Sequence, residues 1–98
     1  MPRRMRMRRV HSEPDVAYFK PAGIPMRELE EVVLTVDEYE SLRLSDLEEL
    51  NQEQASVKMN ISQPTFNRLV SSARKKVTQA IVLGKAIRIE GGSYFISK

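Results

Sequence analysis

Polar and basic side chains of the kinds that bind nucleic acids recur in residues 59–76, which read MNISQPTFNRLVSSARKK. Gln63 and Asn67 can each pair bidentately with adenine, and Arg68 can pair with guanine, when a helix presents them to the major groove. Arg74 and Lys75 stand further along, where we expect contact with backbone phosphates. The residue types in this stretch therefore favour binding of a nucleic-acid duplex.

The rest of the sequence offers little for catalysis. It has no cysteine and one histidine, His11, so a thiolate nucleophile and a Cys/His metal site are excluded. The carboxylate pairs at 30–31 and 48–49 are adjacent, and adjacent side chains on a helix point apart rather than converge as an acid and a base. We explain the glycine pair at 91–92 by a turn instead of a phosphate loop. We expect no enzyme activity, no cofactor and no bound metal.

Charge is segregated along the chain, although the net charge is only +3. Residues 28–53 contain ten carboxylates and one base, whereas residues 54–89 contain seven bases and no acid. A single basic run is more often a solvated helix face than a binding site. Two basic segments on either side of an acidic one favour nucleic-acid binding instead, because their positive field attracts polyanions.

The first of these basic segments is residues 1–15, which we expect to form a flexible arm because apolar residues are almost absent there. Its residues Arg3, Arg4 and Arg6 are expected to contact DNA. They would either read a narrow minor groove or anchor the arm to phosphates without specificity, and we favour the anchor. No apolar run is long enough to cross a membrane and no secretory signal is present, so we expect a cytoplasmic protein.

Three helices are predicted within a single domain that spans residues 16–98. Thr35 and Glu38 form a capping box, so a helix should start there and continue to about residue 49. Asn51 should cap a short helix that ends near Met59. Ser62 should cap a long helix that ends at about Leu83, before the glycine at position 84.

Short strands should accompany these helices. Residues 16–19 and 32–34 are candidates near the N-terminal side, and residues 86–96 read as a hairpin with Ile89 facing Tyr94 and Ile87 facing Ile96. The fold class is therefore mostly α with short β-strands. We expect the open strand edges to build a homodimer through the termini, with or without exchange of strands.

The short helix, the tight turn at Asn60 and the long helix together predict a helix-turn-helix, with three helices in all. An apolar stripe from Phe66 to Ile81 should dock the long helix and leave its other side free for DNA. Lys76 and Lys85 are left open between DNA contact and simple solvation. The residues expected to contact DNA in this domain are Ser62, Gln63, Pro64, Thr65, Asn67, Arg68, Ser71, Arg74 and Lys75.

The segment LTVDEYESLRLSDLEELNQEQASVKMNISQPTFNRLVSSARKKVTQAIVLGKAIRIEGGSYFI resembles the domain of unknown function 134 family, also called uncharacterised protein family 0251. The Arg-rich start and YFKPAGIP extend the resemblance over nearly the whole chain. The family consists of small prokaryotic proteins predicted to bind DNA. The resemblance implies a helix-turn-helix similar to region 4 of sigma factors, and a role in transcriptional regulation.

The sequence departs from this family pattern at a few positions. Family members usually have alanine and glycine where Ser56 and Asn60 stand, and both changes are sterically mild. Gln63 often aligns with a base, so a phosphate or guanine contact is not carried over to it. Met5 and Met7 lie where the family often has cysteine, so no metal role is carried over either.

We therefore expect a sequence-specific regulator that binds double-stranded DNA through the helix from Ser62 to about Leu83. The alternative is a protein–protein interaction module of the transcription machinery, in which the acidic segment 28–53 binds a basic partner such as a subunit of RNA polymerase.

Overall fold

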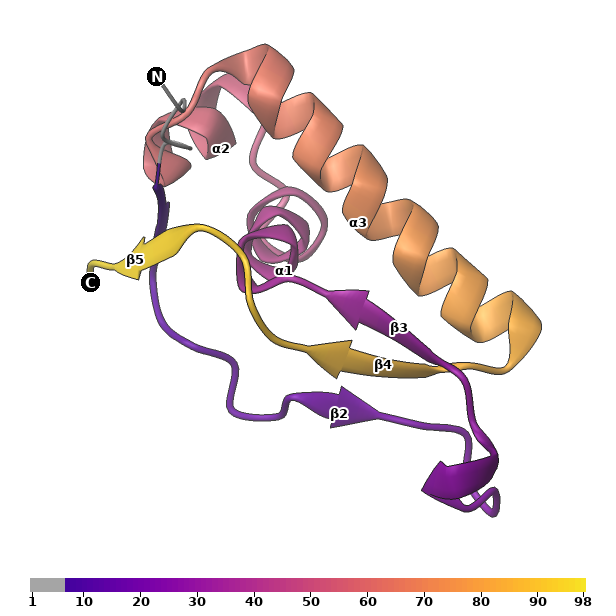
Figure 1. Ribbon diagram of the computed structural model, residues 1–98. Coiled ribbons are helices and arrows are strands. Elements are labelled where there is room, and N and C mark those ends of the chain that lie inside the picture. Colours follow the sequence, from indigo (N-terminus) through magenta and orange to yellow (C-terminus); the bar gives the residue numbers. More distant parts are fainter. Residues whose placement is uncertain (1–6) are drawn as a thin grey trace, which may run out of the picture.

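The computed structural model describes residues 7–98, so the predicted contacts Arg3, Arg4 and Arg6 lie outside the described residues. The helix α3 (Gln63–Leu83) crosses the molecule diagonally, and α1 (Val36–Leu42) packs against it (Figure 1). A three-stranded sheet lies against α3, and a separate strand pair lies near α2 (Gln52–Met59). The fold is mostly helical with short strands near both ends of the chain, as predicted.

The helices begin at the residues that the sequence indicates. Thr35 and Glu38 form the predicted capping box, Asn51 forms a second one with Gln54, and the Ser62 hydroxyl accepts from the Thr65 amide. The first helix does not continue regularly to residue 49, because it widens into a π-helical turn. The helical elements are α1 (Val36–Leu42), the π-helical turn η2 (Arg43–Leu47), α2 (Gln52–Met59) and α3 (Gln63–Leu83), with a short 3-10 turn η1 (Met26–Glu28) before them.

The predicted C-terminal hairpin is wrong, although both of its strands exist. The strand β4 (Ala86–Ile89) runs parallel to β3 (Glu31–Leu34) and antiparallel to β2 (Tyr18–Phe19). The strand β5 (Tyr94–Ile96) instead runs parallel to β1 (Arg8–Val10). Ile89 and Ile87 therefore do not face Tyr94 and Ile96.

The reason lies in how the edges of β4 are used. With β3 on one edge and β2 on the other, β4 has no free edge on which β5 could fold back. The chain continues past the start of α1 instead, where the Val36 amide donates to the Gly91 carbonyl at 3.0 Å. The side chain of Asp37 lies directly against Gly92. The glycine pair thus makes a crossing over α1 rather than a two-residue hairpin turn.

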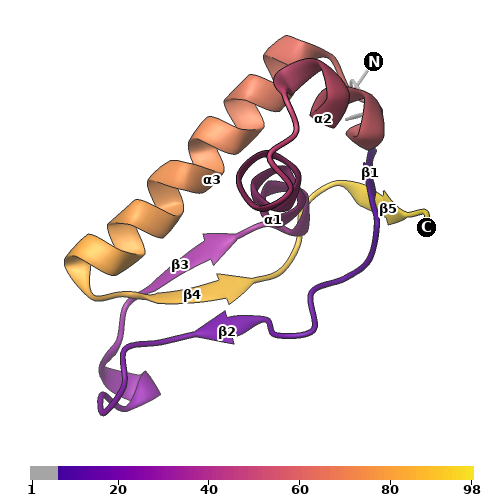
Figure 2. The same cartoon turned by 180° about the vertical axis from the view of Figure 1, so that it is seen from behind.

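The prediction of a flexible arm over residues 1–15 is also wrong for residues 8–10, which form a strand. Val10 is fully buried, and the Arg8 amide donates to the Ser93 carbonyl at 3.0 Å. A strand forms there because the chain end beyond Gly92 offers an edge with which it can pair. The pair β1–β5 lies beside α2, at the end of the molecule opposite the last turn of α3 (Figure 2).

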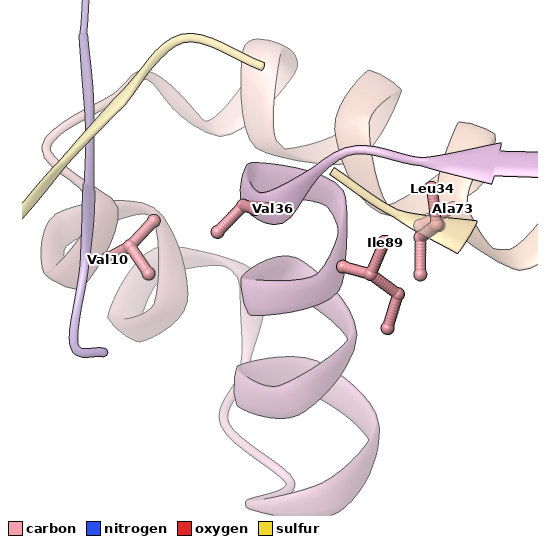
Figure 3. Packing of buried hydrophobic residues seen from close by; sticks show 5 residues of the cluster. All are labelled: Val10, Leu34, Val36, Ala73 and Ile89. Atoms are coloured by element: carbon pink, nitrogen blue, oxygen red, sulfur yellow. The ribbon is translucent and has the colours of Figure 1, made fainter. Parts of the chain in front are cut away.

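Two apolar clusters hold α3 in place. The first joins both chain ends and the sheet to α1 and α3, and its buried members are shown in Figure 3: Val10, Leu34, Val36, Ala73 and Ile89. The second joins α2 to the first half of α3 and consists of Leu44, Ala55, Met59, Phe66 and Val70. Because α3 contributes to both clusters, its orientation is fixed along most of its length.

The predicted apolar stripe of α3 ends earlier than expected. Ala80 is buried, but Ile81 is 74% exposed, and Val82 and Leu83 are exposed beside it. The last turn of the helix extends beyond the sheet that covers the earlier turns (Figure 1). Ile81 therefore does not dock α3 as predicted, and this helix end presents an apolar surface.

Candidate nucleic-acid interface

A tight turn joins α2 to α3. Asn60 ends α2 in the left-handed conformation, with φ 59° and ψ 43°, and its amide donates to the Val57 carbonyl at 3.1 Å. Asparagine adopts this conformation more readily than most other residues because its short side-chain amide can form hydrogen bonds with the nearby backbone. Ile61 then packs against the cluster around Phe66. The turn thereby brings the start of α3 to the surface beside α2.

The side of α3 that faces away from the clusters carries most of the predicted contacts. Two of the three base-reading candidates in its first two turns, Gln63 and Arg68, are exposed, and Lys75 is exposed two turns further on. None of these three side chains forms an ion pair with a described residue. The complete set of exposed predicted contacts is Ser62, Gln63, Pro64, Arg68, Ser71, Arg74 and Lys75.

Ser62 and Thr65 hold the first turn of α3 together. The Ser62 hydroxyl accepts from the Thr65 amide at 3.3 Å and donates to the Thr65 hydroxyl at 2.9 Å. Arg68 Nη2 donates to the same Thr65 hydroxyl at 3.4 Å. These bonds are local and exposed, so they orient the Arg68 guanidinium along the helix without burying it.

Asn67 differs from its neighbours because its side chain turns inward. Its Oδ1 atom is buried and has no hydrogen-bond partner in the described part of the chain. A bidentate contact with adenine needs both the oxygen and the nitrogen of the amide at the surface. The structure therefore does not bring Asn67 together with Gln63 and Arg68 as a reader of bases.

Arg74 is exposed but already engaged within the chain. Its Nε and Nη2 atoms donate to the two Asp46 carboxylate oxygens at 3.1 and 2.7 Å, and Nη2 also donates to Ser45 Oγ at 3.0 Å. The wide turn η2 brings Ser45 and Asp46 to this position. Hydrogen bonds from Arg74 hold the pKa of Asp46 below its usual range. Arg74 is thus not freely available for phosphates, although an exposed pair of this kind contributes only about 0.2–1 kcal/mol.

Lys76 and Lys85, which the sequence leaves open between DNA contact and solvation, are also paired, and so is Arg88. Lys76 donates to Glu38 at 2.7 Å, Lys85 lies 3.1 Å from Glu30, and Arg88 lies 2.7 Å from Glu31. The segregation of charge along the sequence is therefore largely cancelled in space, because bases of residues 54–89 pair with carboxylates of residues 28–53.

Glu38 is the most enclosed member of these pairs. Burial by itself would raise its pKa, but hydrogen bonds from Lys76, Ser72 and Thr35 outweigh that effect and hold the pKa below its usual range. Ser72 donates at 2.6 Å and the Thr35 amide at 2.9 Å. The same carboxylate thus closes the capping box of α1 and fastens α1 to the middle of α3. Lys76 has a structural role rather than a free one.

Some basic residues form no ion pair with a described residue. They make up two groups, and two more of them stand alone. Arg68 and Lys75 lie on the exposed side of α3. Arg9, Lys58 and Lys98 lie around one pocket between β1, α1 and α2. Sequence reasoning missed this second group, since its members are far apart along the chain and meet only because β1 packs against α2. Lys20 and Arg27 are the isolated ones.

Two further features of the described residues bear on function. No group of three or more histidine, aspartate or glutamate side chains in residues 7–98 is arranged to hold a metal ion. Within the same residues, no helix combines the length and apolar character that spanning a membrane requires.

Known proteins resemble the chain over nearly all of its length. The family described as "Protein of unknown function DUF134" matches residues 1–97. The UPF0251 protein TTE1845 of Caldanaerobacter subterraneus subsp. tengcongensis is 57% identical over 94 residues, which cover 96% of this chain and 80% of that protein. The UPF0251 protein of Desulfosudis oleivorans is 60% identical over 94 residues, covering 96% of this chain and 68% of that protein.

A third relative, the UPF0251 protein of Moorella thermoacetica, is 56% identical over 96 residues, which cover 98% of this chain and 64% of that protein. No solved structure matches the chain significantly. With a family match over residues 1–97 and relatives at these identities, the chain belongs to the DUF134 family, whose curated members carry the name UPF0251 protein.

Proposed function

We propose that the protein binds double-stranded DNA sequence-specifically and regulates transcription, with α2, the turn at Asn60 and α3 acting as a helix-turn-helix. The observation that carries this proposal is the free side of α3, where Gln63, Arg68 and Lys75 are exposed and outside the ion pairs that occupy the neighbouring bases. In this role the protein binds and releases DNA without catalysing a reaction.

The arrangement of α3 supports insertion of its first turns into the major groove. The helix is capped at Ser62 and held from behind by Phe66 and Val70, so its exposed side is presented rigidly. Gln63 and Arg68 would then lie at base edges, and Lys75 would lie near a phosphate. Arg74 would join Lys75 only by exchanging Asp46 for a phosphate oxygen.

A homodimer is part of the same proposal, because a two-fold dimer reads a palindromic site with one recognition helix in each half-site. Residues 77–84 carry no charge, and Ile81, Val82 and Leu83 are exposed within them. This helix end is opposite the end that would read DNA. The helix α3 has 21 residues and is about 32 Å long. Two subunits that meet at residues 77–84 would therefore leave the N-terminal end of each α3 free to reach the duplex.

The alternative function, a protein–protein interaction module that binds a basic partner through the acidic segment 28–53, has less support. Seven of the ten carboxylates in that segment are paired with bases of the same chain, including the buried Asp37, Glu38 and Glu40. Glu28, Glu49 and Glu53 remain outside these pairs. RNA polymerase would therefore meet few available carboxylates on this segment.

Selection of bound duplexes from a random library tests the proposed function. The purified protein should enrich one consensus, and a palindromic consensus would support the dimer as well. Equal retention of all sequences would contradict sequence-specific binding. Absence of any retention at low salt would contradict DNA binding altogether, because electrostatic attraction is strongest there.

A further inference from the structure

A basic pocket lies at the end of the molecule where β1 packs against α2 and the chain continues beyond β5. It has a volume of about 180 Å³, and four segments far apart in the sequence form its walls. Figure 2 shows β1 and β5 side by side next to α2 at this end. The charged and polar side chains that line the pocket are Arg9, His11, Glu40, Arg43, Lys58 and Lys98.

The one acidic residue in this lining is already paired within the chain. Glu40 accepts from Arg43 Nε at 2.7 Å and Arg43 Nη2 at 2.9 Å, and from the His11 amide at 3.1 Å. Arg43 also pairs with Glu48 outside the pocket. The group Glu40, Arg43 and Glu48 therefore carries one net negative charge, set against three positive charges from the remaining bases of the lining.

Those remaining bases have unused donors. Arg9 uses only its Nε atom, which donates to the Lys58 carbonyl at 2.9 Å in the last turn of α2. This bond fixes the guanidinium at the mouth of the pocket and leaves both Nη atoms without a hydrogen bond or ion pair to a described residue. The side chains of Lys58 and Lys98 have no such partner among residues 7–98 either, nor has the His11 ring.

The size of the space and its donors specify the ligand. Pockets for drug-sized molecules occupy about 300–1,000 Å³ and are mainly apolar, so this pocket is too small and too polar for such a ligand. A fixed guanidinium beside a lysine matches the tetrahedral oxygens of phosphate, since arginine donates to two of them at once and lysine adds a point charge.

We propose that this pocket binds a phosphate group, with Arg9 and Lys58 as its principal donors. The phosphate belongs either to a free phosphorylated small molecule or to the backbone of the duplex bound by α3. Only the second source rests on the proposed function. Occupation by a phosphate would tie β1 to α2 through a shared ligand.

The single histidine of the chain gives a direct measurement, because its ring protons yield one resolved set of NMR signals from inside the pocket. Titration with inorganic phosphate at constant ionic strength should shift these signals saturably, whereas chloride should not. Arg9→Gln and Lys58→Gln should each weaken phosphate binding about three- to tenfold. Arg27→Gln, an equally exposed change on η1 outside the pocket, should leave it within about twofold.

The two sources separate in a second titration, with the selected duplex in place of phosphate. If the phosphate is from the backbone, the duplex shifts the His11 signals and Lys58→Gln lowers the salt slope of duplex binding by about 0.9. If it is from a free ligand, inorganic phosphate shifts the signals and Lys58→Gln leaves duplex binding unchanged. Signals that respond to neither would overturn the proposal, even if the protein binds DNA. A saturable response to phosphate would uphold it even if the protein binds no DNA.

Discussion

Side chains on the exposed face of α3 differ in what they must give up to contact a duplex. Arg68 gives up only a 3.4 Å hydrogen bond to Thr65, whereas Arg74 must leave the two oxygens of Asp46. The Gln63 side chain has no hydrogen-bond partner in the described chain, while Asn67 would have to turn its buried oxygen outward. At the residue scale, Arg68 and Gln63 are therefore the strongest candidates for reading bases.

Replacement of Arg68 tests this ranking. Arg68→Gln removes a charge that we place at a guanine, so binding to the selected duplex should weaken by about 1–3 kcal/mol and discrimination at that position should decrease. Fluorescence anisotropy with the selected and a scrambled duplex measures both effects. Arg27→Gln is the matched control, because Arg27 is also exposed and unpaired but lies on η1. Equal losses in the two variants would show that only net charge matters.

Glu38 permits a prediction about pH. Its pKa is lowered in the folded protein, so the stability it contributes is present above its unfolded pKa of about 4.3 and is lost as the pH falls through the folded value. Glu38→Gln should lower the free energy of unfolding by about 1–3 kcal/mol at neutral pH and by less in acid. Urea unfolding at several pH values measures this difference. Glu53→Gln, an exposed control, should change little, and a Glu38→Gln loss that does not shrink in acid would contradict the assignment.

At the scale of elements, features that depend on a few neighbouring residues could be predicted from the sequence. The caps at Thr35, Asn51 and Ser62 join atoms three residues apart, and all three are present. Strand pairing was not predictable in the same way, because Arg8 pairs with Tyr94 and the choice depends on which edges of β4 are occupied. For the same reason the hydrogen bond between Arg74 and Asp46, 28 positions apart, could not be predicted from neighbouring residues in the sequence.

The turn between α2 and α3 depends on one left-handed residue. Asn60→Ala should destabilise the protein by about 1 kcal/mol, because a β-carbon without a polar group is disfavoured at φ 59°. Asn60→Gly should be tolerated, since glycine adopts this conformation freely. Thermal unfolding of the two variants compares them directly. If alanine proved as stable as glycine, the turn would not depend on this conformation.

The crossing over α1 depends on a different glycine. A β-carbon at Gly92 would collide with the Asp37 carboxylate, whereas one at Gly91 would meet no atom within 4 Å. Both glycines have positive φ, so Gly91→Ala controls for backbone strain. Gly92→Ala should be the more destabilising variant by about 1–3 kcal/mol, measured by urea unfolding. Equal effects would mean that Asp37 moves aside without cost.

At the scale of the whole molecule, charge and apolar surface are distributed to different ends. Ion pairs between residues 28–53 and residues 54–89 leave free bases on the exposed side of α3 and at the pocket beside α2. The far end of α3 is uncharged and apolar. The sequence predicts the bases but not which of them remain unpaired, because pairing depends on the packing of α1 against α3.

Dimerisation through that apolar end is testable by mass. Ile81→Lys should convert a dimer to a monomer in sedimentation velocity, because a charge would be buried without a partner in the interface. Leu47→Lys is the matched control, since Leu47 is 76% exposed and lies on η2 instead. A wild-type protein that sediments as a monomer would contradict the dimer. A dimer that persists in Ile81→Lys would instead place the interface elsewhere, for example at the strand edges.

The central claim is that the exposed side of α3 contacts the duplex, and amide NMR tests it most directly. Titration of the labelled protein with the selected duplex should produce its largest shifts between Ser62 and Lys75, the region that carries Gln63 and Arg68. Shifts concentrated in residues 28–53 with α3 unaffected, or no shifts at low salt, would contradict the claim.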